Sequence, residues 1–477
     1  MRMTRPTLAK RLHFLLSATL AAAVLSCSTE SIDTPRVISV GRANAAKGGG
    51  TTGPSVTSAN PAYGDEGTTV DVHVLGSGFA TGAQATWLLN GIADPAHVRT
   101  NKTTFVSSTE LVANITIAPD AQLAFWDVQV ALGGKNGVGS ECFEVTSAQI
   151  LGPGTTGGSA AVHGMNDLVQ VAGVSSTNNS STAWYYDAAG GMVSLGSGDG
   201  EAIDPLGQFV AGANSRSIPT AWVRQPNNSW TAQTLLQPAV SIGAIAYGAA
   251  RLADGTALVV GANTLPTKIG ANQNATQPVV WRRGTDGTWS SPQIYPTPPG
   301  FPQSDARDVN GLGQVVGHLG YDQGIVWEDP STYTVLDGTS GRINQAGTLI
   351  VGQNVNHVAV YWWRDPQSHQ WHLPATPLPS LGGAACPDGF GLDVNDSGVI
   401  VGWSCAGSTK NPTVWLLDLS GPSPVLVGTP TRLPGLGFKV KDDLNTARAV
   451  TNSPPFVVTG SAHINTTQRV AVQWNLR

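Results

Sequence analysis

Two ten-residue stretches, DVNGLGQVVG at residues 308–317 and DVNDSGVIVG at residues 393–402, share one pattern. In each, N-x-x-G supplies residues that tolerate the tight turn of a β-hairpin, and the alternating valines after it predict a strand with one buried face. The pattern returns with varying fidelity through the last two-thirds of the chain. Its other copies are GMNDLVQVAG (164–173), AIDPLGQFVAG (202–212), RLADGTALVVG (251–261), RINQAGTLIVG (342–352) and AVTNSPPFVVTG (449–460).

Each copy is followed by a tryptophan at the end of a further apolar segment. We expect these indoles to end a third strand and to be buried between neighbouring sheets. Short apolar segments such as SWTAQTLL (229–236), TWSSPQIY (288–295) and QWHLPATPL (370–378) predict a fourth strand. Four short strands repeated in this way predict the blades of a β-propeller over residues 147–477, with seven blades, or six or eight because the copies diverge. The tryptophans are Trp184, Trp222, Trp281, Trp327, Trp362, Trp415 and Trp474.

The two ends of this region predict that the ring of blades closes. The segment SAQILGPGTTGG (147–158) begins like a fourth strand, and the chain finishes with VAVQWNLR (470–477), which resembles a third strand. An N-terminal strand that completes the last blade removes two sheet edges that would otherwise be open to aggregation.

Residues 54–146 carry short alternating stretches, separated by Gly, Pro, Asn and Asp. The stretches TTVDVHVLGSGF (68–79), AQATWLLNG (83–91), ELVANITI (110–117) and WDVQVAL (126–132) predict a small antiparallel sandwich. The predicted fold class is therefore all-β, a sandwich followed by a propeller.

The first 27 residues are typical of an export signal. Four basic residues precede the apolar run LHFLLSATLAAAVLS (12–26), which is too short to span a bilayer comfortably. Residues 28–53 are rich in Ser, Thr, Ala and Gly and have too little apolar content to order themselves, so they predict a flexible linker.

The stretch VLSC (24–27) resembles the bacterial lipobox. By that resemblance, residues 1–27 are a lipoprotein signal peptide and Cys27 is lipidated. Ser28 then favours the outer membrane or the cell surface over retention at the inner membrane. An ordinary secretion signal with an incidental cysteine is the alternative.

Two further resemblances cover most of the chain. The residues NPAYGDEGTTVDVHVLGSGF (60–79), TTFVSSTELVANI (103–115) and FEVT (143–146) resemble the IPT/TIG family of immunoglobulin-like domains, which implies a spacer or binding module without catalysis. The repeats resemble the bacterial extracellular HAF repeat, most clearly in LGGAACPDGFGLDVNDSGVIVGWS (381–404). TAW, VVW, IVW and TVW stand where that family has His-Ala-Phe. This resemblance implies an extracellular protein.

Export places the other cysteines in a compartment that permits disulfides. Cys386 and Cys405 flank one predicted hairpin, and folding it at its turn brings them nearly opposite each other, which predicts a disulfide. Free thiols are the alternative. Cys142 has no evident partner.

The composition favours strands and excludes some partners. Charged residues make up 12% of the chain, against about 25% in an average soluble protein, and the net charge is -5. Long amphipathic helices need more charge than this. No basic stripe is present to neutralise phosphates, so nucleic acid is not an expected partner. Contact with a membrane is expected only through the lipid anchor.

The sequence assigns no catalytic residue, no cofactor and no metal. It contains no nucleophile elbow, P-loop, zincin helix or paired-cysteine metal site. The D-V-N-x-x-G hairpins resemble calcium loops, but the other copies lack the carboxylates that calcium needs, and turn chemistry explains all of them.

Candidate ligand-binding residues come from a comparison of the repeats with one another. The residue after the repeat glycine is Val174, Ala213, Ala262, His318, Gln353, Trp403 or Ser461, a set without common size or polarity. Since a position that packs blades together is expected to be uniform, we predict a ligand surface there. Blade-filling aromatic side chains are the alternative. The candidates are Trp403, His318, Gln353, Tyr361, Trp363 and Trp371.

The predicted function is recognition or adhesion at the cell surface, with a carbohydrate or a surface protein as the ligand. A polysaccharide hydrolase or lyase with its site in the propeller channel is one alternative, and an envelope scaffold is another. Converging Asp, Glu, His or Arg side chains at the channel mouth favour the enzyme, and an exposed aromatic patch favours binding. Asp305, Asp308 and Asp393 are candidate acids.

Overall fold

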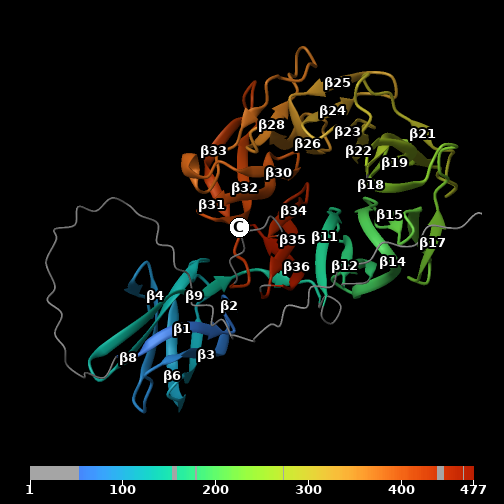
Figure 1. Ribbon diagram of the computed structural model, residues 1–477. Helices are drawn as coiled ribbons and strands as arrows, with labels where there is room; N and C mark the ends of the chain where they lie inside the picture. Colours follow the sequence, from blue (N-terminus) through green and yellow to red (C-terminus); the bar gives the residue numbers. More distant parts are fainter. Residues whose placement is uncertain are drawn as a thin grey trace, which may run out of the picture.

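The computed structural model describes residues 53–152, 158–177, 180–271, 273–437, 445–465 and 467–476. The predicted signal peptide, with Cys27, and the linker up to residue 52 lie outside this range. The described residues form β-strands, one short 3-10 helix, η1 (Gly383–Ala385), and no α-helix (Figure 1). None of their helices has the length and apolar character that a membrane span requires.

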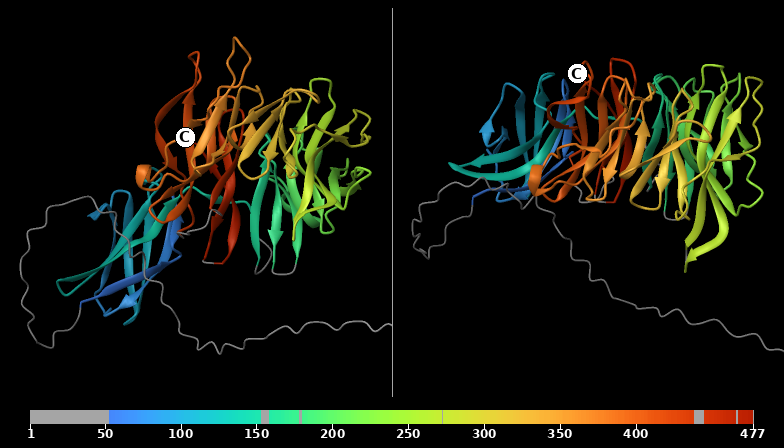
Figure 2. Two further views of the ribbon diagram at one scale, coloured as in Figure 1. Left: turned by 45° about the horizontal axis from the view of Figure 1, so that its top comes forward. Right: turned by 90° about the horizontal axis from the view of Figure 1, so that it is seen from above.

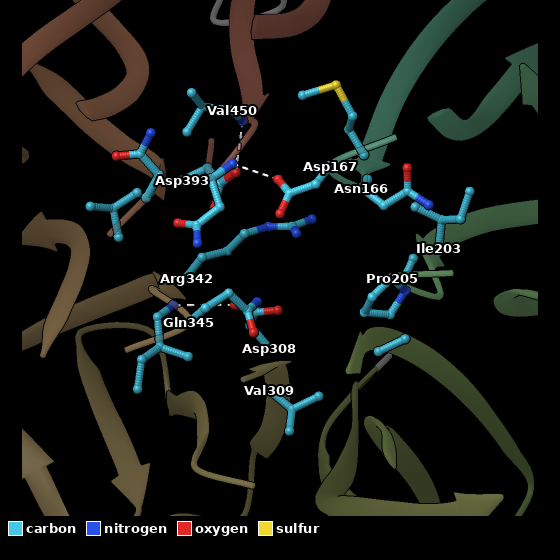
Figure 3. A pocket seen from close by; sticks show the side chains of 18 of the residues that line it. Asn166, Asp167, Ile203, Pro205, Asp308, Val309, Arg342, Gln345, Asp393 and Val450 are labelled. Atoms are coloured by element: carbon cyan, nitrogen blue, oxygen red, sulfur yellow. Dashed lines mark hydrogen bonds between the residues drawn. The ribbon is translucent and has the colours of Figure 1, made fainter. Parts of the chain in front are cut away.

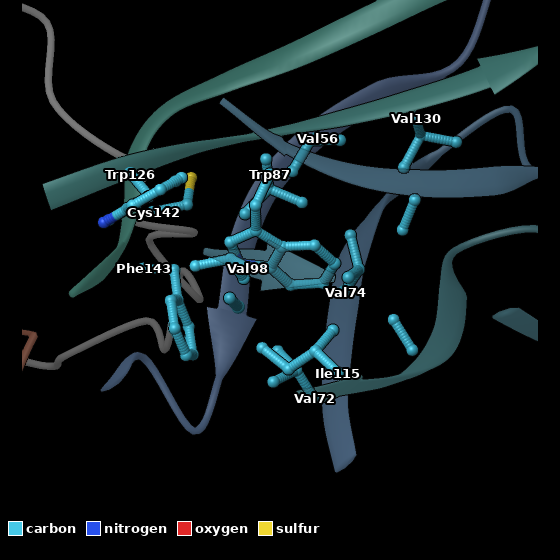
Figure 4. Close-up of a cluster of buried hydrophobic side chains, with 14 of the residues drawn as sticks. Val56, Val72, Val74, Trp87, Val98, Ile115, Trp126, Val130, Cys142 and Phe143 are labelled. Atoms are coloured by element: carbon cyan, nitrogen blue, oxygen red, sulfur yellow. The ribbon is translucent and has the colours of Figure 1, made fainter. Parts of the chain in front are cut away.

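Two sheets pack face to face in the N-terminal part. One contains β1 (Ser55–Asn60), β3 (Thr69–Ser77), β7 (Glu110–Ile117) and β6 (Val98–Ser107), and the other contains β2 (Tyr63–Asp65), β9 (Lys135–Thr146), β8 (Phe125–Leu132), β4 (Gln84–Leu89) and β5 (Ile92–Ala93). All of their strand pairs are antiparallel except that of β2 with β9. Trp87 lies at the centre of the core between them, with its ring edge-on to Phe143 at 5.9 Å (Figure 4). The alternating stretches predicted from the sequence place their apolar residues in this core.

The remaining strands form a ring of small antiparallel sheets, seen along its axis in Figure 1 and from two other directions in Figure 2. The first six repeats each have four strands, with one long strand shared by the first two, and the seventh repeat has three strands in a sheet that is completed by a strand from before the first repeat. The first two repeats contain β11 (Ser159–Met165), β12 (Val171–Ser176), β13 (Ser181–Asp187), β14 (Gly191–Ile203), β15 (Phe209–Asn214), β16 (Pro219–Arg224) and β17 (Trp230–Thr234). The third repeat contains β18 (Gly243–Arg251), β19 (Ala257–Gly270), β20 (Gln273–Arg283) and β21 (Gln293–Ile294), the fourth contains β22 (Ser304–Val309), β23 (Val315–Leu319), β24 (Gln323–Trp327) and β25 (Tyr333–Leu336), and the fifth contains β26 (Gly338–Ile343), β27 (Leu349–Asn354), β28 (Ala359–Trp363) and β29 (Thr376–Pro377). The sixth repeat contains β30 (Gly389–Val394), β31 (Val399–Ala406), β32 (Thr409–Asp418) and β33 (Val425–Arg432), and the seventh contains β34 (Thr446–Val450), β35 (Val457–His463) and β36 (Arg469–Asn475), whose sheet also includes β10 (Gln149–Ile150).

The long strand β14 belongs to two repeats. Its first half, up to Ser197, pairs with β13, and its second half, from Gly198, pairs with β15. Gly196 and Gly198 at the junction both have positive φ, which lets the strand bend from one sheet into the next. The first and second repeats are therefore joined through one strand.

The first strands of the repeats line the inside of the ring. Each of β11, β14, β18, β22, β26, β30 and β34 contacts the next, and β34 contacts β11. On the outer edge, β10 pairs with β36, so the last sheet contains strands from both ends of the ring region. This is the pairing predicted from residues 147–158.

The predicted positions of the tryptophans are confirmed. All of them lie on third strands and are buried. Trp327 packs against Leu258 and Val280 of the preceding sheet, and its indole Nε1 donates a hydrogen bond to the carbonyl of Pro296 at 2.7 Å. The indoles of Trp281, Trp362, Trp415 and Trp474 likewise donate a hydrogen bond through Nε1. Nε1 of Trp184 has no hydrogen-bond partner among the described residues.

The motif asparagine closes its own hairpin and ties it to the next one. Asn310 Oδ1 accepts two hydrogen bonds from its own turn, and Nδ2 donates to the carbonyl of Asn344 in the following repeat at 3.2 Å. The motif asparagines of the first and sixth repeats do the same. Between the last and first repeats, the N–H of Asn452 donates to Asp167 Oδ1. These bonds account for the asparagines without a metal ion.

The motif glycine, on the second strand, lies next to a β-bulge in the first strand. The pairing between first and second strands is interrupted in every repeat, and in the fourth repeat Arg307 is the extra residue. There the carbonyl of Asp305 approaches Gly317 so closely that a Cβ at position 317 would collide with its oxygen. The corresponding carbonyl of the first strand meets Gly173, Gly212, Gly261, Gly352, Gly402 and Gly460 in the same way.

We expect the substitution Gly317→Ala to destabilise the ring by about 1–3 kcal/mol, because the new Cβ overlaps backbone atoms that no side-chain rotation can move. Urea unfolding measures the loss. The matched control is Gly421→Ala, where the nearest atom to the new Cβ is the carbonyl oxygen of Ser423 at an ordinary 3.6 Å. Equal losses in the two variants would contradict the close contact.

A buried carboxylate joins the sandwich to the ring. Glu144 on β9 is fully buried and accepts hydrogen bonds from Arg432 Nη2 at 2.6 Å, from the N–H of Gly435 at 2.9 Å and from the N–H of Gly437 at 2.7 Å. The Arg432 guanidinium also lies 4.7 Å from the centre of the Phe125 ring. Because a buried charge must keep its partners, these contacts fix the sandwich against the end of the sixth repeat.

We expect the substitution Glu144→Gln to lower the free energy of unfolding by about 3 kcal/mol, since it leaves Arg432 without its buried partner. The amide also presents a donor to backbone N–H groups that are themselves donors. Urea unfolding and limited proteolysis between sandwich and ring measure the effect. The control is Glu110→Gln on the outer face of the sandwich, whose exposed pair with His73 contributes little. A loss no larger than that of the control would mean that Glu144 does not hold the interface.

The structure joins Cys386 to Cys405 by a disulfide, with their Cα atoms 5.7 Å apart. Cys142 is buried in the sandwich, and none of the described cysteines is a free thiol.

Candidate functional site

Two cavities lie inside the ring. One, of about 390 Å³, is lined mainly by the middle of the first strands and by parts of some second strands; it is called the basic cavity below. The other, of about 220 Å³, is lined by the ends of the first strands and the motif hairpins; it is called the acidic cavity. Arg342 lines both.

The bulges direct side chains from every repeat into the basic cavity. An extra residue in a strand re-aims its side chain out of the regular alternation. In the fifth repeat the bulge spans Gly341 and Arg342. The lining side chains that the bulges supply are those of His163, Glu201, Tyr247, Arg307, Arg342, Leu392 and Arg448.

Positive charge predominates in the basic cavity, although the whole chain has a net charge of -5. Arg307, Arg342 and Arg448 face one carboxylate, that of Glu201. Burial and the neighbouring Arg342 and Arg307 lower the pKa of Arg448 to about 10, which still leaves it protonated at neutral pH. Arg448 forms no hydrogen bond or ion pair with the part of the chain that the structure describes. Its guanidinium is therefore available to an anion.

Arg307 is held from two sides. Its Nη2 lies 2.7 Å from Asp305 Oδ2, and its guanidinium lies 4.1 Å from the centre of the Tyr247 ring. Burial alone lowers the pKa of Arg307, but Asp305 and Tyr247 outweigh it and raise the pKa. Among the described residues Nε of Arg307 has no hydrogen-bond partner. One donor of a fixed guanidinium thus remains unused.

The single carboxylate of the basic cavity is ionised. Glu201 Oε2 lies 3.1 Å from His163 Nδ1. Burial favours the protonated form of Glu201, but His163, Arg448 and Arg307 together lower its pKa.

Two residues predicted from the sequence, His318 and Trp403, also line the basic cavity. His318 Nε2 donates to the carbonyl of Ser340 at 2.7 Å, and burial lowers the pKa of His318, so the ring is neutral. Lys410 Nζ lies 4.3 Å from the centre of the Trp403 ring. Phe390 adds a second aromatic side chain to this wall.

The other four predicted candidates lie outside the lining of both cavities. Gln353 Nε2 donates to the carbonyl of the nearby Gly389, and Trp363 stacks on a histidine ring. Tyr361 and Trp371 are only 4% and 7% exposed. These contacts fit the alternative that such side chains fill the sheets.

The position after the motif glycine does pack between sheets, despite its varied composition. Val174, Ala213, Ala262, Trp403 and Ser461 are all buried there. Variation at this position is therefore compatible with packing, and Trp403 both packs there and lines the basic cavity.

Sequence reasoning missed the bulge position. In six repeats it lies three residues before the turn residue that begins the hairpin, as Arg307 lies before Asn310, and in the third repeat Tyr247 lies five before Leu252. The signal was a position in the first strand that varies among His, Glu, Arg, Gly and Leu while the residue before it stays apolar or small. Without the bulge, alternation along the strand does not place these residues on one surface.

The acidic cavity, shown in Figure 3, contains Asp167, Asp308 and Asp393. Asp308 Oδ2 accepts a hydrogen bond from the N–H of Ile343, and Asp393 Oδ2 accepts one from the N–H of Val450, so both carboxyl groups connect one repeat to the next. Burial raises the pKa of each, that of Asp393 to about 6. Among the described residues, no cluster of His, Cys, Asp and Glu is placed to hold a metal ion. The third candidate acid, Asp305, belongs to the Arg307 pair.

The pKa of Asp393 predicts a pH-dependent stability. The folded protein keeps a proton on Asp393 up to about pH 6, whereas the unfolded chain loses it near pH 4, so this group makes the fold less stable as the pH rises between these values. We expect Asp393→Asn, which keeps an acceptor for Val450, to raise the melting temperature relative to the natural protein more at pH 8 than at pH 4.

Thermal unfolding across pH 4–8 tests this prediction. The control is Asp418→Asn, because hydrogen bonds from Ser420 lower the pKa of the exposed Asp418 and give the opposite sign. An effect of Asp393→Asn that is the same at every pH would contradict the assignment.

Comparison with known proteins identifies no relative in sequence. No protein family and no curated protein matches the chain. Solved structures that match in shape include the Cps50 (Swd1) β-propeller domain of Myceliophteria thermophila, with a TM-score of 0.42 at 11% identity over 69% of this chain and 99% of that one. A Lactobacillus plantarum protein matches with a TM-score of 0.38 at 13% identity over 65% and 92% of the two chains. The PQQ-bound aldose sugar dehydrogenase of Streptomyces coelicolor matches with a TM-score of 0.32 at 9% identity over 69% and 97%. At these values the similarities carry no argument about function.

Proposed function

We propose that this chain is an exported recognition protein that binds an acidic carbohydrate in the basic cavity of a β-propeller. In this proposal residues 1–27 are a lipoprotein signal peptide with Cys27 as the lipid anchor, and residues 28–53 are a flexible linker. Residues 54–146 are an immunoglobulin-like domain of the IPT/TIG type. Residues 147–477 are a propeller of seven HAF-like blades, closed by its N-terminal strand.

The observation that carries the ligand class is the unpaired positive charge of Arg448 beside Arg307 and Arg342. Guanidinium groups bind carboxylate, sulfate and phosphate oxygens with paired hydrogen bonds, and they do so most strongly where water is partly excluded. The aromatic wall of Trp403 and Phe390 suits the apolar face of a sugar ring. A sugar that bears an acidic group combines both chemistries.

The volume favours a small group over a folded partner. A cavity of about 390 Å³ lies within the range of small-molecule sites, which is about 300–1,000 Å³. A protein partner fills such a space only with a single side chain or a terminus. Among the ligands expected from the sequence, carbohydrate is therefore favoured over a surface protein.

Recognition is favoured over catalysis by the state of the titratable groups. A general base needs a free lone pair aimed at its substrate. His318 commits Nε2 to Ser340, and its Nδ1 faces Asp305 Oδ1 at 3.5 Å. Burial raises the pKa of Tyr247, which keeps its hydroxyl neutral.

A polysaccharide hydrolase or lyase is the second candidate. The convergence of arginine, histidine, tyrosine and carboxylate side chains inside the ring is the arrangement that favours an enzyme. An envelope scaffold, the third function considered, has no observation in its favour. Release of new reducing ends or of unsaturated products from acidic polysaccharides would favour the enzyme over the recognition protein.

We expect galacturonate oligomers to bind the full chain and neutral oligosaccharides of the same length to bind at least about tenfold more weakly, because a hydrogen bond to a charged group contributes about 1.5–3 kcal/mol. Arg448→Gln is expected to weaken galacturonate binding by a similar factor, and added salt to weaken it further. Isothermal titration calorimetry measures both effects.

The matched control is Arg282→Gln, which removes an exposed guanidinium paired with Asp254 on the outer part of the third repeat. It is expected to leave the affinity unchanged. Equal affinity for acidic and neutral oligomers, or an Arg448 variant that binds as well as the control, would contradict the proposed site.

A further inference from the structure

Arg342 crosses the interior of the ring. It begins on β26, and its Nη2 donates a hydrogen bond to the carbonyl of His163 on β11 at 2.6 Å. The strand β26 contacts β22 and β30, whereas β11 contacts β14 and β34, so the two strands are not neighbours. The side chain therefore bridges opposite parts of the inner wall.

This side chain lies where the two cavities meet. Among the described residues it alone lines both, and Figure 3 shows it extended across the acidic cavity with Asp308 and Asp393 near it. The carbonyl that it reaches belongs to the bulge residue of the first repeat, which marks the level of the basic cavity. Arg342 thus separates the basic cavity from the acidic one.

Several charges hold Arg342 in this position. Burial alone lowers its pKa, but Asp308, Asp393 and Glu201 outweigh burial and raise it, so the guanidinium stays charged. Asp308 and Asp393 are in turn fixed by backbone N–H groups of the following repeats. Because these charges and hydrogen bonds fix the Arg342 side chain, it forms a stable partition between the two cavities.

We propose that Arg342 closes the channel and makes the basic cavity a blind pocket that takes the acidic end group of a carbohydrate chain and excludes the interior of a threaded chain. This inference rests on the proposed function and deepens it. A polymer that binds along a channel needs two open ends, whereas a pocket closed by a side chain admits one terminus. The volume of about 390 Å³ suits a terminal residue and part of the next one.

The primary test uses the natural chain and galacturonate oligomers of increasing length, measured by calorimetry at equal chain concentration. We expect the affinity per chain to level off by the disaccharide or trisaccharide, with one protein bound per chain end. Affinity that keeps rising with the number of internal residues, or several proteins bound along one polymer, would overturn the blind pocket. Absence of binding by every oligomer would instead overturn the proposed function itself.

Two variants of Arg342 test the partition directly. Arg342→Ser removes the bridge and its charge, and Arg342→Met removes the charge but keeps an unbranched chain of similar reach. The measured quantity is the ratio of affinities for the hexamer and the dimer, which cancels the loss of charge common to both variants. We expect the ratio to rise about tenfold in the serine variant only, as added sugar residues reach new hydrogen bonds beyond the opened partition.

An unchanged ratio in a folded serine variant would contradict the role of Arg342. Because removal of Arg342 leaves two buried carboxyl groups uncompensated, the serine variant is also made together with Asp308→Asn and Asp393→Asn. These changes keep acceptors for the N–H groups of Ile343 and Val450. Circular dichroism of both forms establishes that they are folded before the ratio is measured.

Discussion

The contact between a carbonyl of the first strand and the motif glycine of the second is the constraint on which the ring and its interior both depend. The bulge brings that carbonyl to a distance that excludes a Cβ, so each repeat needs glycine at one position of the second strand. The same bulge turns one side chain per repeat toward the axis. One local irregularity, repeated around the ring, therefore produces both the recurring sequence pattern and the lining of the basic cavity.

Positive and acidic side chains lie at different levels along the axis of the ring, and the net charge of the chain does not show this separation. Three guanidinium groups gather at the level of the bulges, and three carboxyl groups gather at the level of the hairpins. The carboxyl groups of Asp308 and Asp393 serve structure by binding backbone N–H groups of the next repeat, and their field stabilises the charge of Arg342. Arg448, in contrast, makes no hydrogen bond or ion pair with the described residues, although Glu201 lies near it, and it is the natural contact for a ligand anion.

The sandwich is fixed to the ring through Glu144, whose carboxylate accepts hydrogen bonds from two backbone N–H groups and from Arg432. A buried charge with three donors has one favourable geometry, so the two parts are held in a defined orientation. This arrangement keeps the ring in a constant position relative to the sandwich.

The sequence by itself determined the all-β class, the hairpin at each motif asparagine, the burial of the tryptophans on third strands and the pairing of residues near 149 with the C-terminal strand. These features follow from local turn chemistry and from alternation along a strand, which act over a few residues. Tertiary structure alone decided the site. Arg307, Arg342 and Arg448 are far apart in the chain, and only bulges on separate strands, arranged around one axis, bring their side chains into a single cavity. A bulge cannot be predicted from simple alternation along a strand, because the extra residue shifts the face to which each side chain points.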